Sequence, residues 1–278
     1  MTLLLNGQLF EDADQASVSP RNRGLLYGQN VFETIAVADG VALLLDEHIA
    51  RLTAAAACLH IPLNVGAIRG EIERLSDSKK RAVIRAMVSM GEGGRGYQNP
   101  SSPESVRIVS LHDYPDHPKN YWQQGIHLGL AEIRLGLQPA LAGIKHGNRL
   151  EQIIAREQWQ EEWQEALVLD QNDQVIEATQ ANIFALKNKQ LSTPPLDQAG
   201  VAGIMRDYVL AAANKVGVDS QIVSLSVSDI EAADALFVTN SLIGLWPVKQ
   251  FKKRQYTDFD CAHNLLNLMI QDGAIPTL

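Results

Sequence analysis

Hydrophobic positions near the start of the chain form short runs that are separated by Asn-Gly and Asp-Gly pairs. LLLNGQLF (3–10) and VFETIAVADGVALLL (31–45) both contain such a pair between apolar runs. Asn-Gly and Asp-Gly favour the tight turns of β-hairpins. We therefore predict two antiparallel hairpins in this part of the chain.

The hydrophobic pattern then changes to a helical period. Asp46 is expected to cap the N-terminus of a helix that Pro62 stops near residue 60. Apolar residues spaced by three and four share one stripe of this helix: Ile49, Leu52, Ala56 and Leu59. A second, less amphipathic helix is predicted over about 66–76.

Two apolar strands, 81–90 and 104–111, flank a loop rich in Gly, Ser and Pro at 91–104. Loops of this length without regular structure are frequently functional. The polar stretch 112–122 contains two prolines and is the best candidate for a domain boundary.

The second half of the chain continues with strand-like and helix-like segments. Strands are expected over 125–135, 165–170, within 175–187 and within 235–248, and helices over 147–159, 204–216 and 258–270. We therefore predict an α+β protein with antiparallel hairpins and no regular βαβ series. Its parts would be an N-terminal α/β domain over 1–113, a linker over 114–123 and a larger C-terminal domain over 124–278.

Composition narrows the class of protein. The chain has 278 residues, of which 46% are hydrophobic and 20% charged, which excludes intrinsic disorder. Its 24 Lys and Arg against 32 Asp and Glu give a formal net charge of −8. This charge disfavours binding to nucleic acid but allows a local basic pocket. No apolar run reaches the roughly 18 residues that a membrane span requires, so no membrane association is expected.

The remaining composition predicts a cytoplasmic protein without a metal site. The start of the chain has no basic segment ahead of its short apolar run, unlike a signal peptide. The two cysteines, Cys58 and Cys261, are far apart, which is typical of a reducing compartment and gives no zinc spacing. The histidines are scattered as well.

Common catalytic motifs are absent from the sequence. It contains no phosphate loop of the form GxxxxGK[ST], no HExxH and no GxSxG. The glycine-rich stretch 91–96 joins two predicted strands and opens no helix, so a dinucleotide site is not supported.

Polar residues in apolar or glycine-rich settings are the candidates for chemistry. Lys145 lies between a predicted strand and helix, with glycines at 143 and 147. Partial burial would lower the pKa of its amine and make it a nucleophile; the alternative is a solvated loop lysine. Glu177 either projects from a strand end into a site, where it would hold a protonated ring nitrogen, or lies on the solvent face of an alternating strand.

Two further features could bind an anion. The stretch 200–203 leads into the predicted helix 204–216, and free amides at a helix N-terminus attract phosphate. The alternative is an ordinary glycine-rich helix start. Arg51 lies beside the core stripe of its helix and is either solvated or a charge-assisted clamp on a phosphate.

Taken in order along almost the whole chain, these residues resemble the fold-type-IV pyridoxal-phosphate enzymes, the class IV aminotransferase family. The resemblance rests on motifs spread over both halves: LLNGQLF, SPRNRGLLYG (19–28), VFETI (31–35), DEHIARL (46–52), Lys145, NRL (148–150), EATQANIF (177–184), GIMR (203–206) and TN (239–240). It implies a homodimer with a pseudo-barrel C-terminal domain.

The resemblance also implies a role for each matching residue. Lys145 would form the Schiff base with the aldehyde of pyridoxal 5'-phosphate and then move protons. Arg51, the amides of Ile204 and Met205, and the Asn240 side would bind the phosphate. Glu177 would keep the pyridine nitrogen protonated, so that the ring withdraws electrons.

Within the family, GGRGY (93–97), LAGIKHGNRLEQ (141–152) and LDQAGVAGIMR (196–206) resemble the lyase branch. Its members convert 4-amino-4-deoxychorismate to 4-aminobenzoate and pyruvate for folate synthesis. Arg95, Arg149 and Tyr97 are then the candidates for substrate binding. The alternatives are a branched-chain or D-amino-acid aminotransferase acting on amino acids and 2-oxo acids, or a non-catalytic cofactor-binding protein.

The chain departs from the family pattern at two places. Gln29 and Asn30 replace a common Asp-Gly pair, which puts the details of the substrate in question. Met205 replaces a common hydroxyl residue, so the backbone would have to make the phosphate contact there.

Overall fold

The computed structural model describes residues 1–277, which form two compact units. Unit 1 comprises Met1–Pro115 and the short segment Ile144–Asn148, and unit 2 comprises Asp116–Gly143 and the described residues from Arg149 onward. The chain thus leaves unit 2 for five residues around Lys145 and then returns to it. The predicted domains were consecutive stretches of sequence, whereas unit 2 is interrupted by a segment that belongs to unit 1.

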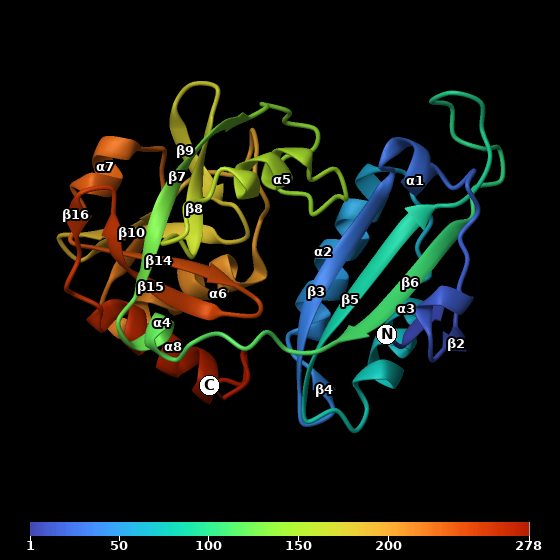
Figure 1. Cartoon of the computed structure of the whole chain (residues 1–278), viewed down its shortest axis with the longest axis horizontal. Coiled ribbons are helices and arrows are strands. Elements are labelled where there is room, and N and C mark those ends of the chain that lie inside the picture. The colour runs from blue at the N-terminus through green and yellow to red at the C-terminus, as the bar shows by residue number, and fades with distance from the viewer. Residues whose placement is uncertain (278) are drawn as a thin grey trace. The chain divides into compact units, whose positions relative to one another are not determined.

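Unit 1 is a two-layer α/β structure. Its six-stranded sheet has the order β2-β1-β6-β5-β3-β4, and all neighbouring strands in it are antiparallel. Helices α2 and α3 pack on the same face of this sheet (Figure 1). The elements are β1 (Leu3–Leu5), β2 (Gln8–Phe10), η1 (Ala13–Gln15), α1 (Arg23–Tyr27), β3 (Asn30–Ala38), β4 (Val41–Ala42), α2 (Leu45–Cys58), α3 (Val65–Ser76), β5 (Arg81–Met90) and β6 (Ser105–His112).

Both predicted hairpins are present in unit 1. Their turns place Asn6, Gly7, Asp39 and Gly40 at positive φ, the backbone conformation that the two-residue hairpin turn requires. The core of the unit lies between the sheet and the helices, where Ile49, Leu52 and Ala56 of α2 are buried as the helical stripe predicts.

The start of α2 differs from the prediction. Leu44, in the left-handed conformation, is the N-cap, and no side chain caps the helix. Asp46 lies two positions further on, in the first turn, where its charge interacts favourably with the helix dipole. It also forms an ion pair with Arg69 of α3.

Unit 2 is built on a ten-stranded mixed sheet that forms a half-barrel, with the path β12-β11-β10-β14-β15-β7-β8-β9-β13 and with β16 paired to β15. Helices α6 and α8 pack against β14 and β15, and α5 packs against β7 and β8. The elements are α4 (Asn120–Gln123), β7 (Ile126–Leu135), α5 (Leu150–Glu157), β8 (Glu165–Asp170), β9 (Gln174–Ala178), β10 (Asn182–Lys187), β11 (Gln190–Thr193), α6 (Ile204–Ala212), η2 (Ala213–Val216), β12 (Asp219–Ile222), β13 (Leu225–Ser226), α7 (Val227–Glu231), β14 (Ala235–Asn240), β15 (Gly244–Phe251), β16 (Arg254–Gln255) and α8 (Asp260–Gln271).

Two elements of unit 2 are shorter than the sequence pattern predicts. Helix α5 begins at Leu150, because 147–148 pair with unit 1 and Arg149 is the N-cap. The stretch 175–187 is broken into β9 and β10 by a bend at 179–181, which Ala178 and Ala181 close through a backbone hydrogen bond of 2.7 Å. Both interruptions occur beside candidate site residues.

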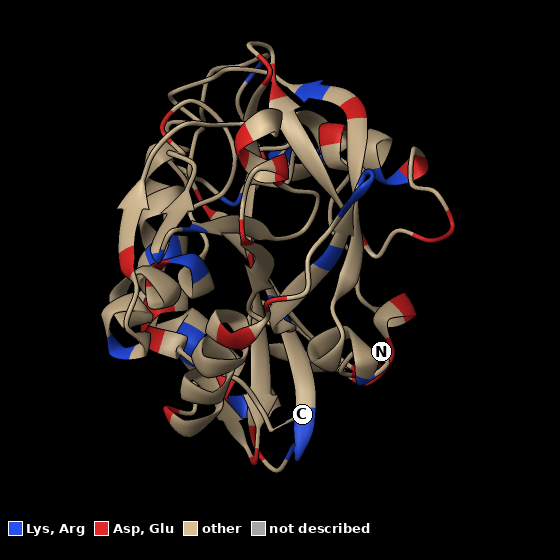
Figure 2. Cartoon of the chain, turned by 90° about the vertical axis from the view of Figure 1, so that its left-hand side faces the viewer, with Lys and Arg blue, Asp and Glu red and all other residues tan. Residues whose placement is uncertain are grey.

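Charged residues of both signs are interspersed along the ribbon (Figure 2). Pairs such as Arg134 with Asp173 and Lys252 with Glu231 lie within 4 Å of each other. Over the described residues 1–277, no helix combines the length and the low polarity needed to cross a membrane.

Candidate active site

Lys145 lies on a short extended segment that is attached to the edge of unit 1. The amide of Phe32 in β3 donates to the Lys145 carbonyl at 3.0 Å, and the Gly147 amide donates to the Asn30 carbonyl at 3.1 Å. Val31 and His146 form an isolated antiparallel bridge. The backbone on both sides of the lysine is therefore fixed by β3.

The side chain of Lys145 is half-buried, and its Nζ lies 4.6 Å from the centroid of the Phe32 ring. A cation is attracted to the face of such a ring. Lys145 is therefore not a freely solvated loop lysine, because its side chain is half-buried against Phe32. The backbone hydrogen bonds to β3 and the Phe32 ring thus define where the amine lies, and its role as a nucleophile stays a prediction.

Arg51 is bound to a buried acid that the sequence did not single out. Its Nε and Nη2 donate to the two carboxylate oxygens of Glu33 at 2.7 and 2.6 Å. His48 Nδ1 lies 2.7 Å from Glu33 Oε2. Glu33 and His48 are each 1% exposed, whereas Arg51 is 14% exposed. The acid fixes the guanidinium, and part of the guanidinium reaches solvent.

The balance of charges in this cluster decides the state of Glu33. Burial alone would raise its pKa, but the charge of Arg51 and hydrogen bonds from His48 and Arg51 outweigh burial and lower the pKa to about 2. Glu33 is therefore ionised over the whole neutral range. Because β3 carries both Phe32 and Glu33, one strand positions the lysine and the arginine.

Glu177 is buried at 5% exposure on β9, which excludes the solvent-facing alternative. Its Oε2 accepts a hydrogen bond from the amide of Val201 at 2.8 Å. Gly200, with φ of +85°, is required beside it, because a Cβ there would lie 2.7 Å from Ile176 and 3.2 Å from the Glu177 carboxylate. The carboxylate is thus held from the 200–201 turn.

That turn leads directly into helix α6. Gly203 is its N-cap and has no side chain to cap the first turn, so the amides at this end are available to an anion. A Cβ on Gly203 would lie 1.9 Å from Asn182 Oδ1, and the Asn182 amide donates to the Val201 carbonyl at 2.9 Å. Strand β10 therefore fixes the start of the helix.

Ile204 and Met205 have buried side chains, at 8% and 1% exposure. Their side chains belong to the core of unit 2, so only their backbone groups can contact a phosphate. This placement agrees with the expectation that a methionine at 205 makes no side-chain contact with phosphate.

Asn240 ends strand β14, and its side chain already makes hydrogen bonds. Its Oδ1 accepts from the amides of Leu242 and Ile243 at 2.9 and 3.0 Å, and its Nδ2 donates to the Gln180 carbonyl at 3.1 Å. The side chain therefore shapes the 240–243 turn and ties it to the 179–181 bend. Because the amides of Leu242 and Ile243 are engaged in this way, the part of the Asn240 region in phosphate binding stays a prediction.

Arg149 is the half-buried N-cap residue of α5. Burial lowers the pKa of its guanidinium, while the charges of Glu177 and Glu151 raise it. Arg149 therefore lies near enough to Glu177 in unit 2 for their charges to interact. It is not the solvated arginine that its place at a helix start would suggest.

Arg95 and Tyr97 lie on the exposed loop of unit 1, and Tyr97 is 88% exposed. The Tyr97 ring packs edge-on against Tyr27 of α1, with centroids 5.6 Å apart. Within unit 1 they do not join Lys145 in any contact that the structure records, so their role in substrate binding stays a prediction.

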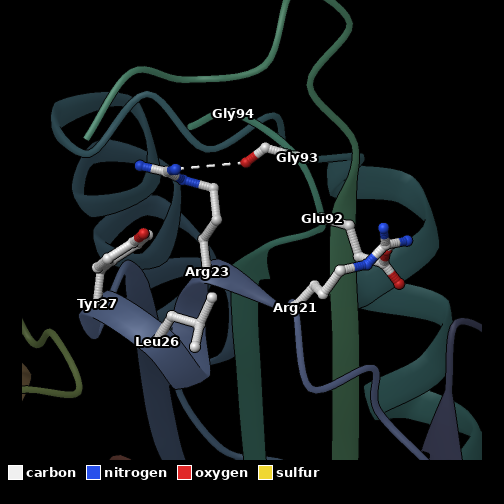
Figure 3. A pocket seen from close by; sticks show the side chains of 7 residues that line it. All are labelled: Arg21, Arg23, Leu26, Tyr27, Glu92, Gly93 and Gly94. Atoms are coloured by element: carbon white, nitrogen blue, oxygen red, sulfur yellow. Dashed lines mark hydrogen bonds and ion pairs between the residues drawn. The ribbon is translucent and has the colours of Figure 1, made fainter. Parts of the chain in front are cut away.

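Arg23 anchors this loop from α1. Its guanidinium donates to the carbonyls of Gly93, Gly96 and Tyr97 at 3.3, 3.0 and 3.2 Å. Figure 3 shows Arg23 extending toward Gly93, with Tyr27 on the same helix. They line a cavity of about 390 Å³ together with Arg21, Leu26, Glu92 and Gly94.

The two residues that depart from the family pattern make structural contacts. Gln29 accepts from Arg23 Nε at 2.7 Å and donates to Asn99 Oδ1 and to the Leu59 carbonyl, both at 3.0 Å. It therefore connects α1, the end of α2 and the 91–104 loop. Asn30 is buried, and within residues 1–277 its Oδ1 has no hydrogen-bond partner.

Sequence reasoning missed Glu33, His48 and Arg23, although all three lie inside the motifs that carry the family resemblance. A signal was present for Glu33, since it is an acid within an otherwise apolar strand pattern, VFETIAVA. A charge at such a position needs a partner. Arg51 and His48 are spaced by three on the following helix and supply it.

A family model for class IV aminotransferases matches residues 30–251 of the chain. The chain belongs to the class IV aminotransferase family. The match includes Lys145, Arg51, Glu177, the start of α6 and Asn240.

Relatives within this family differ in the reaction that their names state. The chain is 35% identical to an aminodeoxychorismate lyase of Vibrio harveyi over 84% of this chain and 87% of the relative. A crystal structure of 4-amino-4-deoxychorismate lyase from Pseudomonas aeruginosa superimposes with a TM-score of 0.90 at 36% identity, covering 97% of this chain and 98% of that one. A D-alanine aminotransferase of Listeria monocytogenes is 26% identical, over 93% of this chain and 90% of the relative.

Unit 1 thus carries an amine and a paired cation, and unit 2 carries a buried carboxylate and an uncapped helix N-terminus. An amine can form an imine, a cation or a helix N-terminus can bind a phosphate, and a carboxylate can stabilise a cationic ring nitrogen. Among residues 1–277, no group of three or more His, Cys, Asp and Glu side chains is arranged to hold a metal ion.

Proposed function

We propose that this enzyme is a pyridoxal-phosphate-dependent lyase that converts 4-amino-4-deoxychorismate to 4-aminobenzoate and pyruvate. The carrying observation is that the amine, acid and anion-binding groups occur in a chain 36% identical to a lyase of this name over 97% of its length. The aminotransferases are less similar, but by a small margin for one of them: a putative branched-chain-amino-acid aminotransferase of Methanocaldococcus jannaschii is 33% identical over 91% of this chain, and the D-alanine aminotransferase is 26% identical.

The proposed cofactor fits the residues present. Lys145 supplies the amine, Glu177 a buried carboxylate, and Arg51 a cation that Glu33 orients. The amides at the start of α6 supply donors for a phosphate, and the 240–243 turn that Asn240 holds is a further proposed contact. When bound, pyridoxal phosphate supplies an electron sink for a carbanion at ring carbon 4 of the substrate, the carbon that bears the amino group.

Lys145 is the proposed acid and base of the reaction. Its amine takes the proton from ring carbon 4 of the substrate, the C–O bond to the enolpyruvyl group breaks, and the ring becomes aromatic. The same amine returns a proton to the departing enolpyruvate. Glu177 keeps a proton on the pyridine nitrogen, and the Val201 amide fixes the carboxylate that does so.

Substrate carboxylates need cations, and Arg149 and Arg95 are the proposed partners, with Tyr97 beside them. Arg149 already interacts with the charge of Glu177. A dianionic substrate would compete with that acid for the guanidinium, so binding and the state of Glu177 are coupled.

A product assay tests the proposed reaction. Purified enzyme is given 4-amino-4-deoxychorismate, and formation of 4-aminobenzoate is measured. The competing proposal is a branched-chain or D-amino-acid aminotransferase, which would move the amino group to a 2-oxo acid without forming 4-aminobenzoate. That outcome would overturn the lyase assignment while leaving the family intact.

A spectral assay tests the role of Lys145, and turnover in the product assay would exclude a non-catalytic cofactor-binding protein. We expect the visible absorbance of the enzyme with cofactor to disappear in Lys145→Ala and to persist in Lys253→Ala, which removes an exposed lysine near β16. Identical spectra for wild type and Lys145→Ala would show that another amine holds the cofactor.

We also propose that the enzyme is a homodimer. Exposed apolar side chains gather on α1 of unit 1, where Leu25 and Leu26 are 69% and 53% exposed. On α5 of unit 2, Leu150, Ile153 and Ile154 are spaced by three and four and share one face, with exposures of 72%, 57% and 48%. Such contiguous patches are typical of interfaces.

Sedimentation velocity tests the dimer. Ile153→Asp should shift the protein toward the monomer, whereas Val41→Asp, at an exposed hairpin position of unit 1, should leave the sedimentation coefficient unchanged. A wild-type protein that sediments as a monomer at micromolar concentration would refute the proposal.

A further inference from the structure

Glu165 is a fully buried acid to which the proposed reaction assigns no role. It begins strand β8, and its side chain points into the bend at 179–181 rather than toward solvent. Its Oε1 accepts from the amide of Ala166 at 3.0 Å, and its Oε2 accepts from the amide of Gln180 at 3.2 Å. The Thr179 side chain interacts with the carboxyl group as well, and its hydroxyl donates to the Ala166 carbonyl at 3.2 Å.

The bend that Glu165 holds connects two parts of the candidate site. Before the bend, Glu177 pairs with Val168 in the register of β8 and β9. Within it, the amide of Gln180 faces Glu165, while the Gln180 carbonyl accepts from Asn240 Nδ2 at 3.1 Å. Gln180 thus connects Glu165 to the 240–243 turn, because its amide donates to Glu165 and its carbonyl accepts from Asn240.

After the bend, Asn182 begins β10 and donates to the Val201 carbonyl. The amide of Val201 in turn holds Glu177. Glu177 precedes the bend and Asn182 follows it, and both are hydrogen-bonded to Val201. A shift of the bend would move the acid and the start of α6 together.

We propose that Glu165 is a positioning residue, which holds the 179–181 bend so that Glu177 and the 240–243 turn keep the geometry needed for the cofactor. This inference rests on the proposed function for its account of what those groups bind. It assigns to Glu165 no contact with substrate or cofactor.

The electrostatics of the position support a specific role. Burial raises the pKa of Glu165 to about 7, while the hydrogen bonds from Ala166, Gln180 and Thr179 oppose that rise. A buried carboxyl stabilised by amides and a hydroxyl is costly compared with an apolar residue. The hydrogen bonds are specific to the bend, which a generic core residue would not reproduce.

Strand β8 offers a matched control at its other end. Asp170 is also buried, at 5% exposure, and its Oδ1 accepts from the amides of Asn172 and Gln174 at 2.8 and 2.9 Å. It caps the 171–174 turn as Glu165 caps the 179–181 bend. Because the contacts of Asp170 are to the β8–β9 turn, it should affect stability without affecting the site.

The test compares Glu165→Gln with Asp170→Asn in the full-length protein. The first readout is the affinity for pyridoxal 5'-phosphate added back to protein from which it has been removed. Loss of one buried acceptor should weaken this affinity roughly tenfold or more in Glu165→Gln. Asp170→Asn should lower the free energy of unfolding by a similar amount to Glu165→Gln, but its cofactor affinity should stay within about twofold of wild type.

The second readout is amide hydrogen exchange without cofactor. We expect faster exchange in Glu165→Gln both at 178–182 and at 240–243, and in Asp170→Asn only around 171–174. A third readout is the split between kcat and KM: Glu165→Gln should lower kcat and leave KM for the amino substrate unchanged. Glu165→Asp, which keeps the carboxylate but shortens its reach, should be intermediate.

The outcomes separate the inference from the proposed function. If wild type binds no cofactor, the proposed function fails, and exchange at 240–243 still decides whether Glu165 controls that turn. Equal weakening of cofactor binding in both variants would reduce Glu165 to a stabilising residue. Unchanged exchange at 240–243 in Glu165→Gln would also overturn the inference. If that variant does not fold, Thr179→Ala, which removes a side chain that interacts with the carboxyl group and with the Ala166 carbonyl, takes its place with the same criteria.

Discussion

Units 1 and 2 each contain a buried glutamate beside a candidate site residue, and the two acids are held in opposite ways. Glu33 in unit 1 is paired with Arg51 and His48, and its pKa is lowered to about 2 although burial opposes this. Glu165 in unit 2 has amides and a hydroxyl as partners, and burial raises its pKa to about 7. Burial is thus the largest single influence on both pKa values; the charged partners outweigh it at Glu33, whereas the amides and hydroxyl only oppose it at Glu165.

The contrast shows what each acid can do for the site. An acid that stays ionised at all neutral pH values can orient a cation, which is the role of Glu33 toward Arg51. An acid held by dipoles fixes backbone geometry, and its charge depends on the pH near neutrality. The two units therefore support the proposed cofactor by different means, one through an ion pair and the other through a bend.

Removing the acid of unit 1 should have the largest effect. Glu33→Ala leaves a buried guanidinium and histidine without their acceptor, and breaking a buried pair in this way costs about 3–5 kcal/mol. The loss is measured from the urea midpoint, together with the affinity for pyridoxal phosphate, which should also fall.

Glu71→Ala is the matched control for that variant. Glu71 pairs with Arg107 elsewhere in unit 1, at 2.8 Å and with 7% exposure. It should destabilise the unit and leave cofactor affinity unchanged. If Glu71→Ala weakens cofactor binding as much as Glu33→Ala does, Glu33 has no special relation to Arg51 and phosphate.

Glu165, the acid of unit 2, should make stability fall as the pH rises from about 4.5 to about 7. Because its pKa is raised from 4.5 to about 7 in the folded protein, the folded state binds the proton more tightly between these pH values. The contribution is complete below pH 4.5 and is lost by about pH 7, a change of about 3 kcal/mol. The free energy of unfolding of Glu165→Gln, subtracted from that of wild type across this range, should show this decline; a flat difference would contradict it.

The acid of unit 1 should make stability fall at the acid end instead. Its pKa is lowered from 4.5 to about 2 on folding, so its contribution is complete above pH 4.5 and is lost as the pH falls toward 2. The amount is also about 3 kcal/mol. Wild type should lose more stability between pH 5 and pH 3 than Glu33→Gln does, in the same denaturant titration. Parallel curves would exclude this linkage.

Arg51→Lys should have the smallest effect on stability. The ammonium keeps the charge beside Glu33 but cannot make the paired contacts of the guanidinium, and we expect a loss of about 1 kcal/mol. Arg107→Lys, beside Glu71, is the control. Only Arg51→Lys should weaken the affinity for inorganic phosphate and for the cofactor, and equal phosphate affinities in both variants would argue against Arg51 as the phosphate ligand.

Local chemistry made much of the fold predictable. The Asn-Gly and Asp-Gly turns of unit 1 and the strands Arg81–Met90 and Glu165–Asp170 were predicted as the structure has them. These elements follow from turn residues and apolar runs within a few positions of one another. The start of α5 was predicted too early, because 147–148 pair with a strand more than a hundred residues earlier in the chain.

The candidate site was less accessible to sequence reasoning. The pattern around Glu177 allowed both a buried and an exposed carboxylate, and the choice depends on Val201, which is distant in sequence. The pairing of Glu33 with Arg51 requires the packing of β3 against α2, and a single sequence does not specify that register. The roles of Arg95, Tyr97 and Asn240 stay predictions.

The excursion of Ile144–Asn148 into unit 1 determines when that unit can be completed during synthesis. Strand β3 receives this segment as a neighbour, so a ribosome that has made only residues 1–115 has released a sheet with an open edge. The edge closes after residue 148 has emerged, when unit 2 is still less than half made. A nascent chain paused between these points would expose β3 and would be a substrate for chaperones. A fragment that ends at residue 115 would lack the lysine and keep the open edge.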